Sequence, residues 1–333
     1  MKNILIITYY FPPNSEIGGI RPYGLAKYLT EFGWKPIILT TTLPGKPDSS
    51  LEIIQVPSID VVAQWKKRFY LNPDQSLNAQ FNLSSEKNKF SIADRIAFLP
   101  SEIITYPDSH IGWYDSAVST GDEIIRSENI DAILSSSHPA TAHLIAQNLS
   151  KRYHIPWIAD FRDLWTQNHY VNHTRIRRYF ETRLEVNIIK QASAITTVSE
   201  PLAQKLSELH RNKPIYSIPN GFDPTLINPV ILLNDRFSIV YTGSLYQGKR
   251  DPEQLFEVIY FLQNNGLLGQ NDVRIDIYGP HENWLENDIE KYHLQDVVTL
   301  YGMVTRERAI TEQRKAQILL LLSCNHTAAK GVY

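Results

Sequence analysis

The chain has 333 residues, of which 43% are hydrophobic and 20% are charged, and its formal net charge is −2. This composition is that of a globular protein long enough for two domains, and the near-neutral charge argues against a nucleic-acid partner. The single cysteine, Cys324, excludes an internal disulfide framework and fits a reducing cytoplasm, and no apolar run reaches the roughly 20 residues that a membrane span needs.

Short apolar runs alternate with helical patterns along the chain. Strands are expected first at 3–9, 36–41, 131–136, 155–159, 194–198 and 214–218. After a break rich in proline and turn-forming residues at 220–236, further strands are expected at 237–243, 273–278, 297–301 and 317–323. This alternation predicts parallel sheets built from βαβ units, and the break predicts a domain boundary between residues 225 and 226. The polar, aperiodic residues 72–93 are expected to form a long loop.

Two glycines and an arginine follow the first predicted strand, in "EIGGIRPYGLAKYL". Pro22 suits the first turn of the helix that begins here, and Gly33 is expected to end that helix. Ligands bind at the carboxyl ends of parallel strands, and a helix N-terminus attracts anions. Gly18 and Gly19, with Arg21, are therefore a candidate anion site. The alternative is a tight turn whose arginine is solvated.

The second predicted domain begins in a similar way, with a strand, a loop and a helix in "YTGSLYQGKRDP". Asp251 is expected to be the N-cap of that helix, with Pro252 at its first position and Gln254 completing a capping box. Lys249 and Arg250 are thus expected at a helix N-terminus, beside a glycine-containing loop.

Several motifs, taken in their order and spacing, resemble those of GT-B glycosyltransferases of family four, the "group 1" kind. They are "GGIRPYGLAKYL", "SSSHPATAHLIA", "IPWIADFRDLW", "ASAITTVSEPLAQKL", "IPNGFDP", "YTGSLYQGKRDP" and "LYGMV". The resemblance implies two Rossmann-like α/β domains with helices on both faces of parallel sheets. Residues 1–225 would form the acceptor side and residues 226–333 the nucleotide-sugar side.

The resemblance also implies a function. A cytoplasmic enzyme of the hexosyltransferase type would move a sugar from a nucleoside diphosphate sugar to a saccharide or lipid-linked saccharide. Configuration would be retained, and the product would belong to cell-surface polysaccharide or lipopolysaccharide synthesis. The nucleotide-sugar is a co-substrate, and no other cofactor is expected.

Donor residues follow from the same resemblance. Gly18 and Gly19 would let a sugar diphosphate lie on the loop, with the charge of Arg21 nearby. In the second domain, the diphosphate-binding residues would be Gly243, Ser244, Lys249 and Arg250. Ser244 stands where the family usually has an arginine, so Lys249 and Arg250 are expected to neutralise the leaving group, unless they form only a solvated basic loop. The residues of the nucleotide-base region would be Gly279, Gly302 and Met303.

Catalytic candidates follow the apolar run "IPWIA", at the carboxyl end of a predicted strand, in "DFRDLW". They are Asp160, Arg162 and Asp163, and many family members carry a histidine about where Arg162 stands. One aspartate is expected to orient the acceptor or to accept its proton. The alternative is a structural pair of aspartate and arginine.

Histidines supply further candidates. His138 is expected either to contact the acceptor or to cap the following helix, whereas His143 on that helix is expected to be structural. The stretch "PDSHIGWY" contains Asp108, His110 and Trp113, and one interpretation places these residues on the acceptor side.

Residues 61–71, "VVAQWKKRFYL", mix aromatic and basic side chains. This combination suits peripheral contact with the inner face of a membrane, and the alternative is an ordinary surface helix. The sequence has no Asp-x-Asp element and no cluster with zinc spacing, so a metal-independent mechanism is expected.

The last predicted strand lies close to Tyr333, with no covering helix after it. A strand of a parallel sheet is normally followed by such a helix, and family members continue with a glutamate-bearing loop that grips the donor. We therefore expect a truncated second domain and poor activity from these residues alone. Two other functions stay open: a GT-B nucleotide-sugar 2-epimerase, and a non-catalytic subunit that binds nucleotide-sugar.

Overall fold

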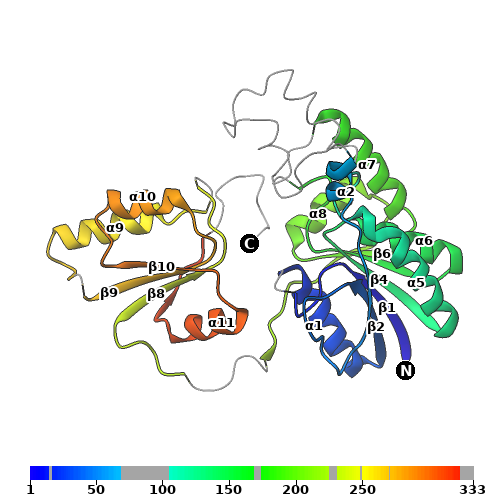
Figure 1. Cartoon of the computed structure of the whole chain (residues 1–333), viewed down its shortest axis with the longest axis horizontal. Coiled ribbons are helices and arrows are strands. Elements are labelled where there is room, and N and C mark those ends of the chain that lie inside the picture. Colours follow the sequence, from blue (N-terminus) through cyan, green and yellow to red (C-terminus); the bar gives the residue numbers. More distant parts are fainter. Residues whose placement is uncertain are drawn as a thin grey trace. The chain divides into compact units, whose positions relative to one another are not determined.

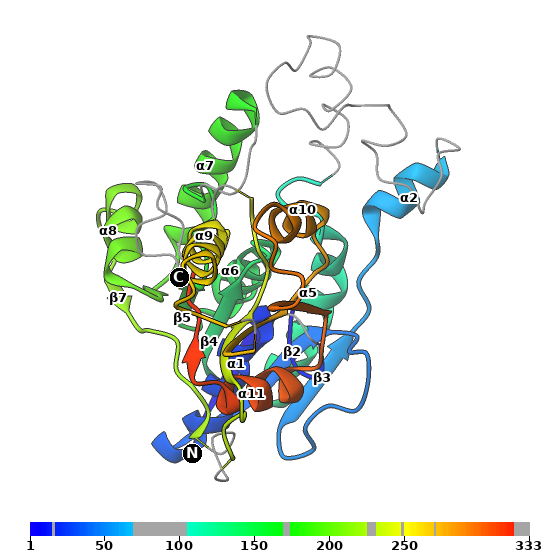
Figure 2. The same cartoon turned by 90° about the vertical axis from the view of Figure 1, so that its left-hand side faces the viewer.

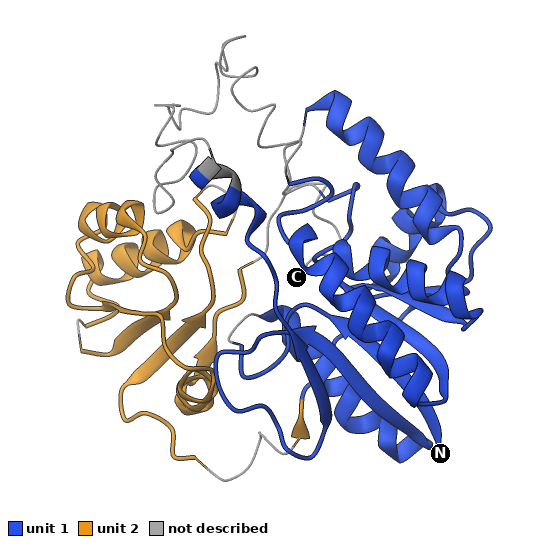
Figure 3. Ribbon diagram, turned by 45° about the vertical axis from the view of Figure 1, so that its right-hand side comes forward, with its two compact units in different colours: residues 1–222 blue, residues 223–333 orange. Residues whose placement is uncertain are grey.

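The computed structural model describes residues 1–14, 17–68, 105–168, 174–224, 231–247, 250–269 and 271–322. The chain divides into two compact units, residues 1–222 and 223–333, which Figure 3 colours separately. Each unit contains its own parallel sheet with helices on both faces, so the predicted α/β class with two Rossmann-like sheets is confirmed. The predicted loop at 72–93 lies outside the described residues.

Unit 1 contains a seven-stranded sheet in the order β3-β2-β1-β4-β5-β6-β7, and every neighbouring pair is parallel. Its strands are β1 (Lys2–Thr8), β2 (Trp34–Thr41), β3 (Glu52–Val56), β4 (Ile130–Ser137), β5 (Trp157–Phe161), β6 (Ala194–Thr197) and β7 (Ile215–Ser217). Six of them match predicted strands. The edge strand β3, "EIIQV", is missing from the prediction because its polar and apolar residues show neither strict alternation nor a continuous apolar run.

The helices of unit 1 cover both faces of this sheet (Figure 1). They are η1 (Ile17–Gly19), α1 (Ile20–Leu29), η2 (Thr30–Phe32), α2 (Val61–Arg68), η3 (Ile111–Trp113), α5 (Tyr114–Ser127), α6 (Thr141–Tyr153), α7 (Arg175–Ile189) and α8 (Glu200–Leu209). On one face, Ile4 and Ile6 of β1 pack with Ala26 of α1. On the other, Gly121 of α5 leaves room for Leu149 of α6, because a Cβ there would lie 2.5 Å from the Leu149 Cδ1 atom.

Unit 2 contains a four-stranded parallel sheet in the order β10-β9-β8-β11. Its strands are β8 (Phe237–Thr242), β9 (Val273–Tyr278), β10 (Val298–Gly302) and β11 (Ile318–Leu319), and its helices are α9 (Glu253–Asn264), α10 (Asn283–Lys291) and α11 (Arg306–Lys315). Figures 1 and 2 show α9 and α10 on one face of the sheet and α11 on the other. The buried Phe256 of α9 packs into a core with Ile239 and Ile275.

Local sequence signals set most of the helix ends. Gly33 has a φ of 81° and ends the η2 turn, as its position predicts. The predicted cap of α9 is wrong by one residue: the helix begins at Glu253, and its N-cap is Pro252. Asp251 instead lies just before the cap, where its Oδ1 atom accepts a 3.4 Å hydrogen bond from the Glu253 N–H. Every helix in the described part of the chain is too short or too polar to cross a bilayer.

Candidate functional site

Both sheets reverse their strand order beside their first strand. In unit 1, β1 lies between β2 and β4, and in unit 2, β8 lies between β9 and β11. Loops leave the carboxyl ends of the two neighbouring strands in opposite directions at such a point, and doubly wound sheets bind their ligands there. The segments that follow β1, β4, β5 and β8 are therefore where each unit is expected to present functional side chains.

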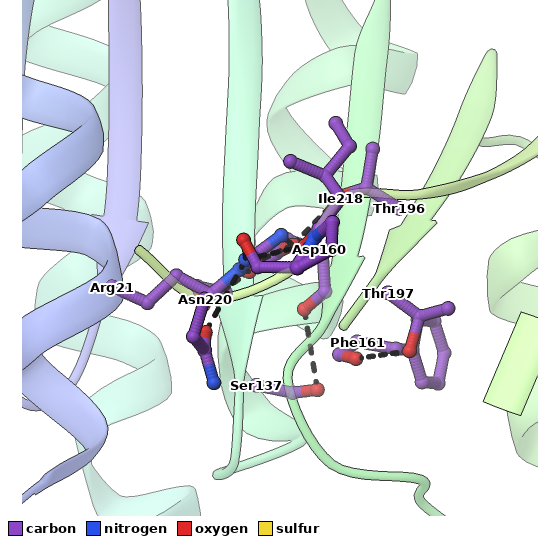
Figure 4. Close-up of polar contacts among 10 residues, drawn as sticks. Arg21, Ser137, Asp160, Phe161, Thr196, Thr197, Ile218 and Asn220 are labelled. Atoms are coloured by element: carbon purple, nitrogen blue, oxygen red, sulfur yellow. Dashed lines mark hydrogen bonds and ion pairs between the residues drawn. The ribbon is translucent and has the colours of Figure 1, made fainter. Parts of the chain in front are cut away.

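Arg21 and Asp160 form a buried ion pair near the carboxyl ends of the unit 1 strands, shown in Figure 4. The Nε atom of Arg21 donates to both carboxylate oxygens of Asp160, at 3.1 and 3.0 Å, and its Nη2 atom donates to Oδ1 at 2.9 Å. The side chains are only 7% and 1% exposed. The Nη1 atom of Arg21 donates to the Ile218 carbonyl at 2.8 Å and to the Asn220 Oδ1 atom at 3.3 Å. Arg21 thus ties α1 to β5 and to the segment after β7.

Hydroxyl groups complete the surroundings of Asp160. Ser136 on β4 donates to Oδ2 at 2.8 Å, and Thr196 on β6 donates to Oδ1 at 2.7 Å. Each oxygen of Asp160 thus accepts from a hydroxyl as well as from Arg21, and the residue is fully buried. This geometry agrees with the alternative interpretation of Asp160 as half of a structural pair, although the partner is Arg21 and not its sequence neighbour Arg162.

Arg162 and Asp163 follow β5 and lie nearer the surface. The Arg162 Nη2 atom is 3.0 Å from the Asp163 Oδ2 atom, and the side chains are 19% and 42% exposed. A Cβ atom on Gly18 would lie 3.2 Å from the Arg162 Nη2 atom and 3.0 Å from the Tyr10 ring. The space beside Gly18 is therefore filled by protein, which agrees with the tight turn of the alternative interpretation, but Arg21 is buried against Asp160 and is not solvated. Gly19 is similar, because a Cβ there would lie 3.0 Å from the Phe11 Cα atom.

Aromatic and imidazole rings gather beside this loop. We call Tyr9, Tyr10, His110 and His138 the imidazole cluster. The His110 Nε2 atom lies 3.3 Å from the Tyr10 hydroxyl, and the His110 ring centroid lies 4.2 Å from that of Tyr9 and 6.2 Å from that of His138. Buried Asp108 supports the cluster by accepting a 2.9 Å hydrogen bond from the His110 N–H. Asp108 and His110, which one interpretation of the sequence places on the acceptor side, therefore join His138.

The charge states in the cluster follow from their surroundings. His138 is exposed, but the protein atoms around its ring desolvate it and lower its pKa. The carboxylates of Asp108 and Asp163 oppose this shift, whereas the nearby His110 and Arg162 add to it, and the net direction is downward. Burial opposes ionisation of Asp108, yet hydrogen bonds from His110 and Thr141, and the charge that His138 carries when it is protonated at low pH, hold the Asp108 pKa below its usual value. His138 is thus neutral at pH 7 and can accept a hydrogen bond from a hydroxyl group.

His143 lies behind the cluster, in the core. Its Nδ1 atom is 2.7 Å from the Ser135 Oγ atom, which in turn accepts a 2.7 Å hydrogen bond from the Trp157 Nε1–H. His143 is wholly buried, and burial lowers its pKa to about 3. The ring therefore stays neutral and acts in packing, as the sequence predicts.

In unit 2, three glycines, Gly243, Gly279 and Gly302, join the carboxyl ends of β8, β9 and β10, and we call this the glycine edge. The Gly243 N–H donates to the Tyr278 carbonyl at 2.9 Å, and the Gly279 N–H donates to the Gly302 carbonyl at 3.0 Å. A Cβ atom on Gly279 would lie 2.1 Å from the Gly243 carbonyl oxygen, so only glycine fits there. The structure thus brings the predicted residues Gly243, Gly279 and Gly302 together, and the following Met303 is 74% exposed.

Arg250 lies beside this edge. Its backbone pairs with that of Tyr246, and its guanidinium carbon lies 5.9 Å from the Tyr246 ring centroid. Within the described residues, the buried Nε atom of Arg250 has no hydrogen-bond partner. The Tyr241 hydroxyl donates to the Ser244 carbonyl at 3.0 Å, which fixes the loop after β8. Lys249 lies outside the described residues.

Sequence reasoning missed some of these residues. Tyr9 and Tyr10 directly follow the first strand, and that position was the signal that could have identified them. Ser136 and Thr196 carry no such signal, because their role depends on strands that are adjacent only in the folded sheet. In the described part of the chain, no three His, Cys, Asp or Glu residues are grouped so that they could hold a metal ion.

Two Rossmann-like parallel sheets, each with helices on both faces, are the architecture of GT-B enzymes. The family model described as Glycosyltransferase Family 4 matches residues 20–226, which is more than half of the chain. The chain belongs to this family, as its motifs predict, and the predicted enzyme class of glycosyltransferase is confirmed. No curated protein matches the chain in sequence.

Solved structures share the fold. Sucrose-phosphate synthase from Thermosynechococcus elongatus is 15% identical, with a TM-score of 0.56, over 96% of this chain and 75% of its own. HepE from Anabaena, solved in complex with UDP and glucose, is 11% identical, with a TM-score of 0.52, over 96% of this chain and 73% of its own. The N-terminal domain of a Candida albicans trehalose-6-phosphate phosphatase is 12% identical, with a TM-score of 0.58, over 97% of this chain and 77% of its own.

Proposed function

We propose that the protein transfers a sugar from a nucleoside diphosphate sugar to a hydroxyl of a saccharide or lipid-linked saccharide. Family membership supplies the reaction class, and the complex of HepE with UDP and glucose supports this class of donor. The observation that carries the proposal is Arg250, whose buried Nε atom lacks a described partner beside the glycine edge of unit 2. A partly exposed guanidinium whose Nε donor is unused is suited to an anionic ligand.

On the donor side, the glycine edge would let the nucleotide approach the backbone closely. Arg250, together with Lys249, would neutralise the diphosphate as negative charge develops on the leaving group. Met303 is exposed and would contact the base. The three glycines therefore shape the site, and the two cations supply its charge.

On the acceptor side, His138, Arg162 and Asp163 reach the surface in the segments after β4 and β5. The neutral imidazole of His138 and the half-exposed carboxylate of Asp163 would orient the attacking hydroxyl and accept its proton. Arg21 and Asp160 would hold this edge in place without contacting the substrate, because both are buried in their mutual pair.

Retention of configuration and a place in surface polysaccharide or lipopolysaccharide synthesis belong to the same proposal. Both rest on the resemblance of the motifs. The proposal assigns the nucleotide-sugar the role of co-substrate and includes no further cofactor.

Calorimetric titration of the full chain with UDP, ADP and GDP tests the donor site. We expect one nucleotide to bind, and we expect Arg250→Ala and Lys249→Ala each to weaken its binding by about tenfold, since a charge-assisted hydrogen bond contributes about 1.5–3 kcal/mol. Arg211→Ala is the control. This exposed arginine lies on the loop that enters β7, at the amino end of that strand, whereas the proposed sites lie at the carboxyl ends of strands. Unchanged affinity in both variants would refute the assignment, and isomerisation of the nucleotide-sugar without an acceptor would refute sugar transfer.

A further inference from the structure

Helix α7 exposes large apolar side chains on its outer face. Ile176 is 68% exposed, Tyr179 58% and Phe180 56%, and Val186 continues the row at 37%. Residues 176, 179 and 180 are spaced i, i+3 and i+4, so they share one side of the helix. Exposed apolar groups gathered on one face mark a surface that meets a partner. In Figures 1 and 2, α7 lies at the margin of unit 1.

The acidic residues of α7 face the protein interior, and most of its basic residues face outward. Its two acidic residues, Glu181 and Glu185, are 2% and 1% exposed and turn inward. The Glu181 Oε1 atom accepts from the Arg177 Nε at 2.7 Å, and Glu185 accepts from His210 and Thr166. The exposed charged residues of the helix and its C-cap are all cations: Arg175, Arg178, Arg183 and Lys190. The outer face is therefore apolar and positive, with no exposed acid of its own.

Buried contacts hold this helix rigidly. Arg177 donates to the Thr105 carbonyl at 2.9 Å and to the Pro107 carbonyl at 3.1 Å. The Glu185 Oε2 atom accepts from the Thr166 N–H at 3.0 Å, and Thr166 lies on the loop that carries Arg162 and Asp163. Glu185, one of the two inward carboxylates that leave the outer face positive, therefore also fixes α7 to the loop after β5.

We propose that the outer face of α7 docks on the surface of an anionic lipid bilayer. Ile176, Tyr179 and Phe180 would enter the interface between headgroups and acyl chains, and the arginines would contact lipid phosphates. A second copy of the chain is a poorer occupant, because pairing two such faces would bring like charges together. The surface differs from the predicted contact at 61–71, of which only residues 61–68 are described, and it does not depend on the proposed donor or acceptor.

Vesicle co-sedimentation with the full chain tests this proposal. Phosphatidylglycerol vesicles should bind the protein at least tenfold more strongly than phosphatidylcholine vesicles, and added salt should weaken the binding. The apolar variant Ile176→Ser/Tyr179→Ser/Phe180→Ser should lose at least tenfold in affinity. The charge variant Arg175→Gln/Arg178→Gln/Arg183→Gln should lose about a hundredfold, since each cation near an anionic surface contributes about fivefold.

The matched control is Val258→Ser/Phe261→Ser on α9, whose side chains are 54% and 60% exposed. It should bind phosphatidylglycerol vesicles like the unmodified protein, and circular dichroism should show that every variant is folded. If the apolar variant is misfolded, the charge variant decides, since it changes only exposed side chains. Equal binding to both kinds of vesicle, retained binding in the charge variant, or a dimer in light scattering that the apolar variant dissociates would overturn the proposal.

Discussion

At the residue scale, the pair of Arg21 and Asp160 holds two opposite charges at a buried position of unit 1. Asp160→Asn leaves the guanidinium of Arg21 buried without a counter-charge, so we expect the free energy of unfolding to fall by about 3–5 kcal/mol. Urea unfolding followed by circular dichroism measures this change. The matched control, Asp163→Asn, should cost less than about 1 kcal/mol, because its carboxylate is 42% exposed.

The double variant Arg21→Gln/Asp160→Asn isolates the coupling within this pair. Because the two side chains are in direct contact, the loss in the double variant should be clearly smaller than the sum of the two single losses. Additive losses would mean that each residue acts through its other neighbours, and the proposed role of the pair as the tie between α1 and β5 would then be wrong.

His143 should make stability depend on pH. Its pKa is lowered to about 3 in the folded protein, against about 6.5 in an unfolded chain. Between pH 3 and pH 6.5 the folded state thus binds fewer protons than the unfolded state. The contribution of neutral His143 to the free energy of unfolding is complete above about pH 6.5 and is lost as the pH falls toward about 3. The slope reaches at most about 1.4 kcal/mol per pH unit.

Thermal and urea unfolding between pH 4.5 and pH 8 would show this slope. The variant His143→Asn keeps an acceptor for the Ser135 hydroxyl but does not titrate, so its stability should vary less with pH than that of the unmodified protein. His281→Asn is the control, because the His281 side chain is 59% exposed. Parallel pH profiles in all three proteins would contradict the assignment.

Contacts between residues far apart in the chain are what the sequence could not predict. The motif around Asp160 correctly indicated an aspartate at a strand end, but its partner, Arg21, lies 139 residues away in the chain. Spacing could not show that contact, since it exists only once β1, β4 and β5 are adjacent. Gly18 illustrates the same limit: a conformationally permissive residue fits a ligand or a protein side chain equally well, and here the space is taken by Arg162 and Tyr10.

At the scale of elements, the glycine edge of unit 2 depends on close contact between backbones. Gly279→Ala would place a methyl group 2.1 Å from the Gly243 carbonyl oxygen, so the β8 and β9 ends would have to separate. We expect a loss of about 1–3 kcal/mol in stability and weaker nucleotide binding. Differential scanning calorimetry and nucleotide titration would measure both.

Gly24→Ala provides the contrasting control for that prediction. Gly24 lies inside α1, and a Cβ atom there would meet nothing within 4 Å. The substitution should therefore stabilise the protein by about 0.5–1 kcal/mol, because glycine is a poor helix former. If Gly279→Ala were as harmless as Gly24→Ala, the three joined strand ends would not be the rigid frame that the donor site needs.

Element prediction succeeded where periodicity was strong. Nearly every buried strand was identified from its apolar run, because a strand covered on both faces has few polar residues. The start of α9 was misplaced by one residue, since Asp251 and Pro252 both suit a helix start and only the folded chain distinguishes them. Edge strand β3 was missed because its half-buried residues give a mixed pattern.

At the scale of the whole molecule, the two units carry different parts of the proposed reaction. In unit 1, the segments after β1, β4 and β5 carry Tyr9, Tyr10, His138, Arg162 and Asp163. In unit 2, glycines join the ends of β8, β9 and β10, and Arg250 lies on the segment between β8 and α9. The motif resemblance predicts the same division, with the acceptor side in the first domain and the nucleotide-sugar side in the second. The resemblance could not show which side chains at the strand ends are accessible to a ligand. Asp160 is buried and Asp163 is exposed because of how the folded chain packs around them.

This division predicts that the chemical step and nucleotide binding can be impaired separately. His138→Gln removes the proposed proton acceptor, so it should lower kcat by about a hundredfold while nucleotide Kd changes less than twofold. Arg250→Ala should instead raise the nucleotide Kd. Steady-state assays with the sugar nucleotide selected by titration, combined with calorimetry, would separate the two effects.

The pH profile gives a readout that a structural role of His138 would not change. Because the surroundings lower its pKa, activity of the unmodified protein should persist below the ordinary histidine pKa of about 6.5 and fall only when His138 becomes protonated. The residual activity of His138→Gln should lack that acidic limb, whereas His281→Gln should keep it. Equal losses in kcat and nucleotide affinity, or an unchanged acidic limb in His138→Gln, would show that His138 shapes the fold and does not handle the acceptor's proton.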